Sequence, residues 1–150
     1  MDEIDRKILA ELQRDGRQTL TELAGRVRLS TSPCHRRLRE LEHSGAITGY
    51  HARLDAAVLG LAFQALVFVT MRYSDRDTLT GFEAAVERIP NVVQAQRLFG
   101  EPDYLLHVVA RDLAAYQELY DESLATLPGI QKLGSTLVMK SLVEARPLPL

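Results

Sequence analysis

Before residue 50, apolar positions recur with helical spacing, and they predict three short helices. The stripe of the first helix consists of Ile4, Ile8, Leu9 and Leu12. This i, i+4, i+5, i+8 pattern is typical of an amphipathic helix of about three turns. Asp2 is placed to cap its start, and Asp15-Gly16 to end it, since Gly16 tolerates a positive φ. The first element is therefore predicted to be a helix packed through one face.

The second and third helices are separated by a tight connection. Thr19 and Glu22 form a capping box at the start of the second helix, whose apolar face holds Leu23, Ala24 and Val27. After Arg28-Leu29-Ser30-Thr31, a third helix runs through Pro33 to Ser44 and stops at Gly45. Either Ser30 or Ser32 can be its N-cap, since both choices keep Pro33 in the first turn. Three short helices with this turn have the outline of a helix-turn-helix unit.

Beyond Gly45 the pattern changes to strands alternating with helices. Residues 46–54 alternate well enough to predict a strand, the wing of a winged helix-turn-helix, and residues 55–61 are interpreted as a linker. The later elements are, in order, a strand 63–73, a helix 79–89, strands 92–99 and 104–110, a helix 113–127 and a strand 130–142. Two successive βαβ halves predict a ferredoxin-like βαββαβ domain with both helices on one face of an antiparallel sheet.

The predicted fold class is thus α+β, with two domains. The domains are a helix-turn-helix with its following strand at 1–54, the linker at 55–61, the ferredoxin-like domain at 62–142 and a C-terminal tail at 143–150. The uncovered sheet face needs a cover, and in a chain of 150 residues a second copy is the expected one. We therefore expect a homodimer.

Composition places the chain among soluble proteins, and the distribution of charge adds a second conclusion. A single Cys cannot form an intramolecular disulfide, no signal peptide or membrane helix is evident, and we expect a cytoplasmic protein. The net charge of −2 divides into +2 for residues 1–54 and −4 for the rest. Six Arg and one acidic residue lie between Arg17 and Arg39. Such a basic cluster suits a polyanion, although by charge alone an ordinary solvated helix face fits equally well.

The third helix strengthens the nucleic-acid interpretation. Cys34, Leu38 and Leu41 form its buried stripe, while His43 and Glu40 lie outside that stripe. A recognition helix reads base edges in the major groove with its N-terminal residues, and basic residues near the turn contact phosphates. The predicted contacts with double-stranded DNA are Ser32, His35, Arg36 and Arg39 from the outer face, Arg37 from the flank, and Arg17, Arg26 and Arg28 around the turn.

Several segments together resemble the Lrp/AsnC (feast/famine) transcriptional regulators. They are Asp5-Arg6-Lys7-Ile8-Leu9, Asp15-Gly16-Arg17, 29–38, 45–50, Gly100-Glu101-Pro102-Asp103-Tyr104 and Leu127-Pro128-Gly129-Ile130. The resemblance spans nearly the whole chain. It implies DNA binding by the first domain, effector sensing by the second, small amino acids as effectors and dimers that assemble further, as octamers or open helices. One departure is Thr31, where the family usually has Pro, and it affects where the recognition helix starts.

The resemblance also implies an effector site between dimers, near the turn at residues 100–103. Gly100 allows backbone N–H groups to approach a carboxylate, and the Asp103 carboxylate can pair with an α-amino group. The predicted effector-binding residues are Leu98, Gly100, Glu101, Asp103, Tyr104, Ser135 and Thr136. The alternative is a plain Gly-Glu-Pro-Asp turn that holds no ligand.

No constellation of residues predicts catalysis, a metal site or a cofactor. The four His show no metal-ligand spacing, and Cys34 belongs to a buried stripe. One enzymatic alternative remains, because sirohaem decarboxylases resemble this family in both domains, and His107 is the residue that invites the comparison. A module that signals only through protein contacts is a third class, but it needs no Arg-rich third helix. The favoured prediction is a sequence-specific, effector-responsive DNA-binding regulator rather than an enzyme.

Overall fold

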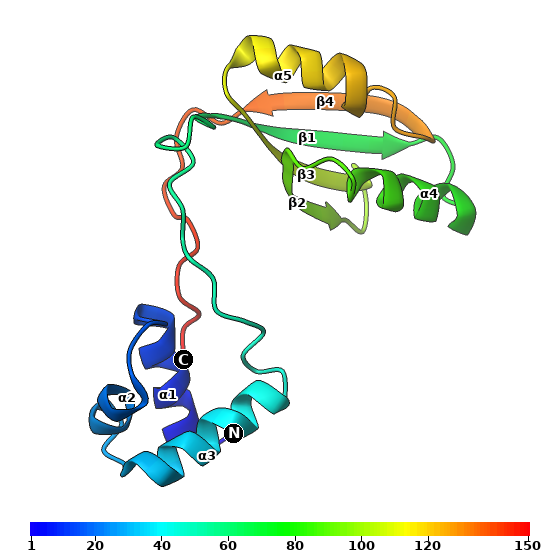
Figure 1. Ribbon diagram of the computed structural model, residues 1–150. Coiled ribbons are helices and arrows are strands. Elements are labelled where there is room, and N and C mark those ends of the chain that lie inside the picture. Colours follow the sequence, from blue (N-terminus) through cyan, green and yellow to red (C-terminus); the bar gives the residue numbers. More distant parts are fainter. The chain divides into compact units, whose positions relative to one another are not determined.

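The computed structural model describes all 150 residues, which form two compact units (Figure 1). The first unit comprises Met1–Arg53 together with Leu142–Leu150, and the second comprises Leu54–Ser141. Each unit has its own cluster of buried apolar side chains. None of the helices combines the length and the apolar character needed to cross a bilayer.

The first unit contains three helices, α1 (Glu3–Arg14), α2 (Leu20–Arg26) and α3 (Thr31–His43). Asp2 caps α1 and exchanges backbone–side-chain hydrogen bonds with Asp5, at 2.8 and 2.9 Å. Thr19 and Glu22 form the predicted capping box of α2. These reciprocal bonds satisfy N–H groups that a helix start otherwise leaves without partners.

Helix α3 begins after Ser30 and ends at a left-handed glycine. Ser30 is the N-cap but makes no side-chain hydrogen bond, and Pro33 lies in the first turn, where no intrahelical donor is lost. Gly45 follows with φ +76°, as the sequence predicted for the stop. The core of the unit joins all three helices through Ile8, Leu23, Ala24, Val27, Cys34 and Leu41.

One prediction for this unit is wrong. Residues 46–54 form no strand, because no other segment of the chain pairs with them and a strand needs a neighbour for its backbone groups. The predicted end of α1 at Asp15-Gly16 is confirmed. Asp15 is the C-cap, is extended and donates its N–H to the carbonyl of Glu11, and the turn does not use a positive φ at Gly16.

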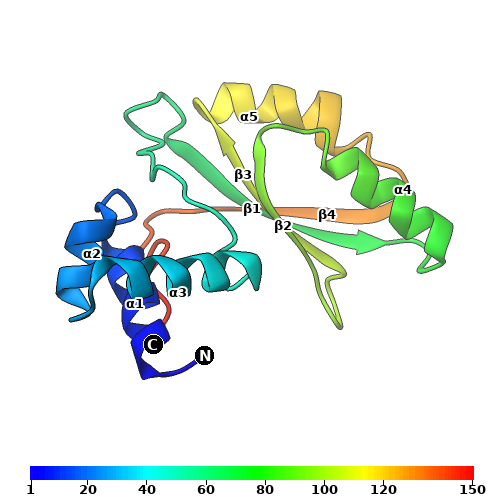
Figure 2. The same cartoon turned by 60° about the horizontal axis from the view of Figure 1, so that its bottom comes forward.

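The second unit has the predicted βαββαβ order around one antiparallel sheet. Its elements are β1 (Phe63–Met71), α4 (Arg76–Val86), β2 (Val92–Arg97), β3 (Tyr104–Ala110), α5 (Leu113–Leu119), one π turn η1 (Tyr120–Leu124) and β4 (Ile130–Leu137). The strand order is β2-β3-β1-β4, with every neighbouring pair antiparallel. Both helices lie on the same face of this sheet (Figure 2).

Several predicted boundaries shift for local reasons. Helix α4 starts earlier than residue 79 because the Asp75 carboxylate caps it, accepting from the backbone N–H of Thr78 at 2.9 Å. The α-helical part of the predicted helix 113–127 ends at Leu119 and continues as η1. Strand β4 ends at Leu137 rather than 142, since its register places Leu137 opposite Ala65, close to the start of its partner β1 at Phe63.

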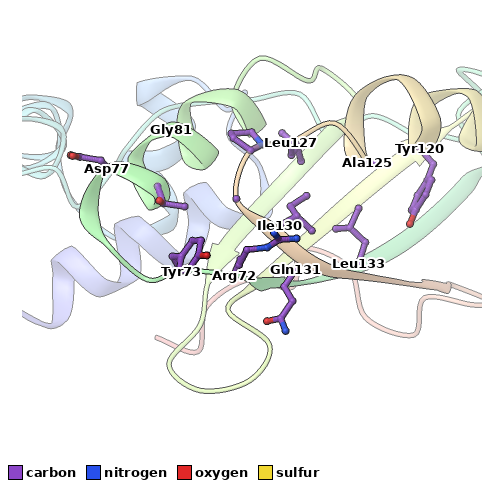
Figure 3. A pocket seen from close by; sticks show the side chains of 13 residues that line it. Arg72, Tyr73, Asp77, Gly81, Tyr120, Ala125, Leu127, Ile130, Gln131 and Leu133 are labelled. Atoms are coloured by element: carbon purple, nitrogen blue, oxygen red, sulfur yellow. The ribbon is translucent and has the colours of Figure 1, made fainter.

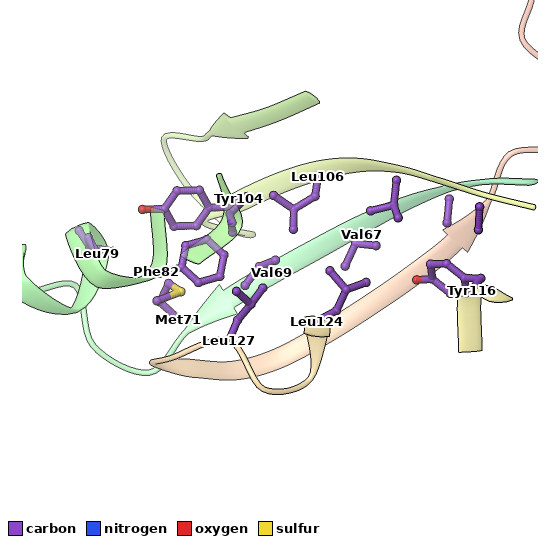
Figure 4. Close-up of a cluster of buried hydrophobic side chains, with 14 residues drawn as sticks. Val67, Val69, Met71, Leu79, Phe82, Tyr104, Leu106, Tyr116, Leu124 and Leu127 are labelled. Carbon is purple, nitrogen blue, oxygen red and sulfur yellow. The ribbon is translucent and has the colours of Figure 1, made fainter. Parts of the chain in front are cut away.

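Alternating side chains of β1 and β3 build the core between sheet and helices (Figure 4). Val67, Val69 and Leu106 are fully buried there, against Phe82 of α4 and Leu124 of η1. The opposite face of the same strands is formed by Gln64, Leu66, Phe68, Leu105 and His107. No helix packs on that face, so its half-buried apolar side chains remain without a cover from their own unit.

Candidate DNA interface and effector site

Helix α3 presents a polar outer face opposite its buried one. Cys34 and Leu41 are buried against α1 and α2, whereas Ser32, His35 and Arg36 are exposed. Arg39 is exposed as well. The structure thus places the four residues predicted to contact DNA from the outer face on the solvent side of one helix, with Ser32, His35 and Arg36 in its N-terminal half. This is the geometry that a recognition helix needs to enter a major groove.

The basic groups around α3 are mostly available to a polyanion. Arg17, Arg28 and Arg39 have no acidic partner within 4.0 Å. Arg36 lies 3.5 Å from Glu40, and Arg26 lies 3.4 Å from Glu11. Exposed pairs of this kind contribute little free energy, so a phosphate competes with them easily.

Arg37 has a different environment from the other predicted DNA contacts. Its guanidinium donates to the carboxylates of Asp2 and Asp5 at 2.7 and 2.8 Å, and its side chain is only 23% exposed. The hydrogen bonds to Asp5 and then Asp2 raise the pKa of Arg37. Arg37 therefore ties α3 to the start of α1, a structural role that sequence spacing alone did not reveal.

Arg28 occupies the turn between α2 and α3 with φ +59°. Its N–H donates to the carbonyl of Gly25, and the N–H of Leu29 donates to that of Ala24, at 3.2 and 2.9 Å. The left-handed region favours glycine, and another L-residue there costs about 1 kcal/mol. An arginine at this position brings a guanidinium to the turn at the expense of backbone strain.

In the second unit, Asp103 closes the β2–β3 loop against β1. Its carboxylate oxygen Oδ2 accepts from the backbone N–H of Met71 at 2.7 Å, and its own N–H donates to the carbonyl of Val69 at 2.9 Å. Its carbonyl accepts from the N–H of Leu98 at 2.7 Å. Gly100 at the tip has φ +128°, a conformation that glycine adopts without strain. The loop is thus anchored at Asp103.

The remaining predicted effector residues do not gather at this loop within one chain. Tyr104 is buried on the helix side, and its hydroxyl donates to Glu83 Oε1 at 2.7 Å. Burial, and secondly the Glu83 carboxylate, raise the pKa of Tyr104 to about 12. Ser135 Oγ lies 2.6 Å from the Tyr116 hydroxyl on α5, while Thr136 pairs with Leu66. A single chain therefore brings together Leu98, Gly100, Glu101 and Asp103 only.

A further pocket lies elsewhere in the second unit and was not predicted. It has a volume of about 660 Å³ and lies between α4 and the segment from η1 into β4; we call it the α4–β4 pocket (Figure 3). Arg72, Tyr73, Gly81, Leu127 and Ile130 contribute to its lining. None of the seven predicted effector residues lines it. The only sequence signal for it was the Pro128-Gly129 turn that starts β4.

No group of three His, Cys, Asp or Glu residues is placed to hold a metal ion. His107 lies on the open sheet face with a ring nitrogen 3.2 Å from Gln64 Oε1. Cys34 is fully buried, and this burial raises the pKa of its thiol. His107 thus makes a side-chain hydrogen bond on the open sheet face, and Cys34 is part of the core of the first unit.

A helix-turn-helix unit with an Arg-rich recognition helix, joined to a ferredoxin-like domain, defines a DNA-binding regulator with a separate sensing domain. Comparison with known families agrees with this class. Residues 1–42 match the AsnC-type helix-turn-helix domain, and residues 64–148 match the Lrp/AsnC ligand binding domain. The chain belongs to the Lrp/AsnC family of transcriptional regulators.

Individual relatives match over nearly the full chain. The leucine-responsive regulatory protein of Rhizobium meliloti is 39% identical over 97% of this chain and 93% of its own length. The Bkd operon transcriptional regulator of Pseudomonas aeruginosa is 39% identical over 100% and 98%. These relatives are transcriptional regulators, and nothing among them supports the decarboxylase alternative.

Solved structures show the same architecture. A transcriptional regulator from Neisseria meningitidis in complex with L-Met has a TM-score of 0.94 at 38% identity, covering 99% of this chain and 96% of that one. An AsnC family regulator from Agrobacterium tumefaciens has a TM-score of 0.94 at 35% identity, covering 99% and 97%. The fold and the order of both domains are therefore those of the family.

Proposed function

We propose that this chain binds double-stranded DNA through α3 and alters that binding when an amino acid occupies its second unit. The observation that carries the DNA part is the outer face of α3, where Ser32, His35, Arg36 and Arg39 are exposed together. Arg36 and Arg39 read base edges, and Arg17, Arg26 and Arg28 contact phosphates. The protein works in the cytoplasm, where its DNA lies.

The proposed effector is an amino acid, and the L-Met complex of the Neisseria relative supports this chemistry. The β2–β3 loop offers exposed Gly100 and Glu101 beside the Asp103 carboxylate. The α-amino group pairs with Asp103, whose second carboxylate oxygen, Oδ1, makes no hydrogen bond within the chain. Because Ser135 and Tyr104 point to other partners, a complete site needs groups from a second copy near this loop.

The proposed assembly starts with a homodimer through the open sheet face. Leu66, Phe68 and Leu105 lie on this face without a helix to cover them, and a second sheet packed face to face buries them. Further association of dimers brings effector loops of different copies together. A ligand bound between dimers then shifts the balance between assemblies according to its differential affinity for them. No catalytic step and no cofactor belong to this function.

The deciding experiment is a gel-shift titration with the DNA upstream of the chain's own gene, repeated with and without each amino acid. Arg39→Ala is expected to weaken binding by roughly 1–3 kcal/mol and to relax base preference. Arg14→Ala, which removes an arginine already paired with Glu11 on α1, is the control. Equal affinity of Arg39→Ala and wild type refutes the groove assignment, and binding that no amino acid alters refutes the effector proposal.

A further inference from the structure

Phe99 is a fully exposed aromatic side chain at the tip of the β2–β3 loop. It follows the exposed Leu98, and no side chain of its own chain shields it from solvent. Single exposed apolar residues are common on protein surfaces. An aromatic ring at a loop tip, however, is the type of residue that anchors protein–protein contacts when a pocket is available to it.

The same chain carries an acceptor of suitable size, the α4–β4 pocket. Its apolar wall comes from Leu127, Pro128 and Ile130, and Tyr73 is exposed at its rim. A Cβ on Gly81 would meet no atom within 4 Å, so this glycine leaves the α4 side of the pocket open. Glycine inside a helix destabilises it by about 0.5–1 kcal/mol relative to alanine. Gly81 therefore leaves this side of the pocket open at some cost in helix propensity.

Charges beside the two features are complementary. Glu101, two residues after Phe99, is exposed and has no cationic partner within 4.0 Å. Arg72 at the pocket is also exposed and unpaired, and Figure 3 shows its side chain alongside Ile130. Asp77, the acidic residue of the lining, points away from the cavity in the same view. The pocket therefore presents a positive charge beside an apolar wall.

Loop and pocket lie at the same end of the sheet. The N–H of Met71 donates to Asp103 at the base of the loop, and the N–H of the next residue, Arg72, donates to the carbonyl of Gly129 at the pocket, at 2.7 and 2.8 Å. Every copy thus has both the exposed Phe99 side chain and the α4–β4 pocket at the same end of its sheet. Such a contact is either exchanged between two copies or continued around a ring.

We propose that Phe99 of one copy of this chain inserts into the α4–β4 pocket of a second copy, with Glu101 pairing with Arg72 across the contact. The inference rests on the proposed assembly, because it supplies the contact between dimers that the open sheet face does not supply. It also places the effector loop at a subunit interface, where an amino acid can favour one assembly over another.

The test is analytical ultracentrifugation of the full chain over a range of concentrations. Wild type is expected to associate beyond the dimer, and Phe99→Ser to raise the dissociation constant of that step at least about tenfold. Met139→Ser, which removes another fully exposed apolar side chain, is the matched control and leaves the step unchanged. Gly81→Leu fills the pocket from α4 and is expected to act like Phe99→Ser, whereas Gly25→Leu, at an equally open helical glycine of α2, has no effect.

A charge exchange makes the test specific to this pairing. Glu101→Arg and Arg72→Glu each weaken the association, and the double variant restores it. An unchanged mass distribution for Phe99→Ser overturns the inference. It is also overturned if Gly81→Leu abolishes amino-acid stabilisation in a thermal-shift assay while the mass stays the same, since the pocket then holds a small ligand. DNA binding by wild type and by Arg39→Ala is measured separately. A result that refutes this inference therefore does not refute the proposed function.

Discussion

The Asp103 carboxylate accepts a hydrogen bond from the backbone N–H of Met71 at 2.7 Å. The residue proposed to hold an effector's amino group thus also fastens the β2–β3 loop to the end of β1. Oδ2 makes this bond, whereas Oδ1 makes no hydrogen bond within the chain. A substitution at this position therefore tests two roles that a neutral isostere can separate.

Asp103→Asn is expected to keep the bond to Met71 through its amide oxygen while losing the negative charge. The melting temperature should stay close to that of wild type, but stabilisation by amino acids should disappear. Asp103→Ala should lower both the melting temperature and the stabilisation by amino acids. The melting temperature falls because the N–H of Met71 loses its acceptor, at a cost of about 1–3 kcal/mol. Thermal-shift measurements of both variants decide this. Full amino-acid response in Asp103→Asn contradicts the pairing with an ammonium group.

Arg28→Gly should stabilise the first unit while weakening its DNA binding. Glycine relieves the strain at φ +59°, which is worth up to about 1 kcal/mol in the free energy of unfolding. Loss of one phosphate contact should reduce affinity evenly across DNA sequences and lower the salt slope by about 1. Denaturant unfolding and salt-dependent binding measure the two effects. A more stable variant with unaltered DNA affinity means that Arg28 contacts no phosphate.

The Arg37 cluster predicts an acid-sensitive contact between α1 and α3. The backbone bond from Asp5, and then the bond from Arg37, hold the pKa of Asp2 below its usual value of 3.8. This stabilisation is complete above the unfolded pKa and is lost as pH falls through the lower, folded one. Arg37→Gln should lower the melting temperature at pH 7. It should also reduce the difference in melting temperature between pH 7 and pH 3. Thermal unfolding followed by circular dichroism measures this difference. If it is the same in Arg37→Gln as in wild type, the ion pair is not the cause of the acid sensitivity.

Gly129 and Gly25 should respond oppositely to alanine. Gly129 has φ +74°, and an added Cβ would collide with Thr78 Cγ2, so Gly129→Ala is expected to destabilise the second unit by more than about 1 kcal/mol. Gly25 is helical with open space around it, and Gly25→Ala should stabilise α2 by about 0.5–1 kcal/mol. Urea unfolding of both variants compares them. Equal effects would show that the tight approach of β4 to α4 is not rigid.

Cys34 should be unreactive in the folded protein. Its side chain is fully buried among Ile8, Leu23 and Leu41, and burial raises the pKa of the thiol, which disfavours the reactive thiolate. A thiol reagent at pH 8 should label it only after denaturant is added. Cys34→Ser should destabilise the unit more than Cys34→Ala does, because the hydroxyl lacks a partner in an apolar core. Rapid labelling under native conditions contradicts this burial.

The sequence by itself determined the local elements and their order. The capping box of Thr19 and Glu22, the stop at Gly45 and the alternation in β1 follow from short-range geometry, so periodicity and cap chemistry were sufficient to predict them. The buried stripe through Cys34 also fixed which side of α3 faces outward. The face proposed to read DNA rests on that orientation.

Only the tertiary structure decided features that depend on distant partners. The strand predicted at 46–54 is absent because strand formation needs a second segment, which the chain does not provide. Arg37 links α1 and α3, and the Tyr104 hydroxyl bonds to Glu83, because residues far away in sequence are their partners. The α4–β4 pocket exists for the same reason. A sequence pattern records what each residue prefers, whereas long-range packing selects which of those preferences is satisfied.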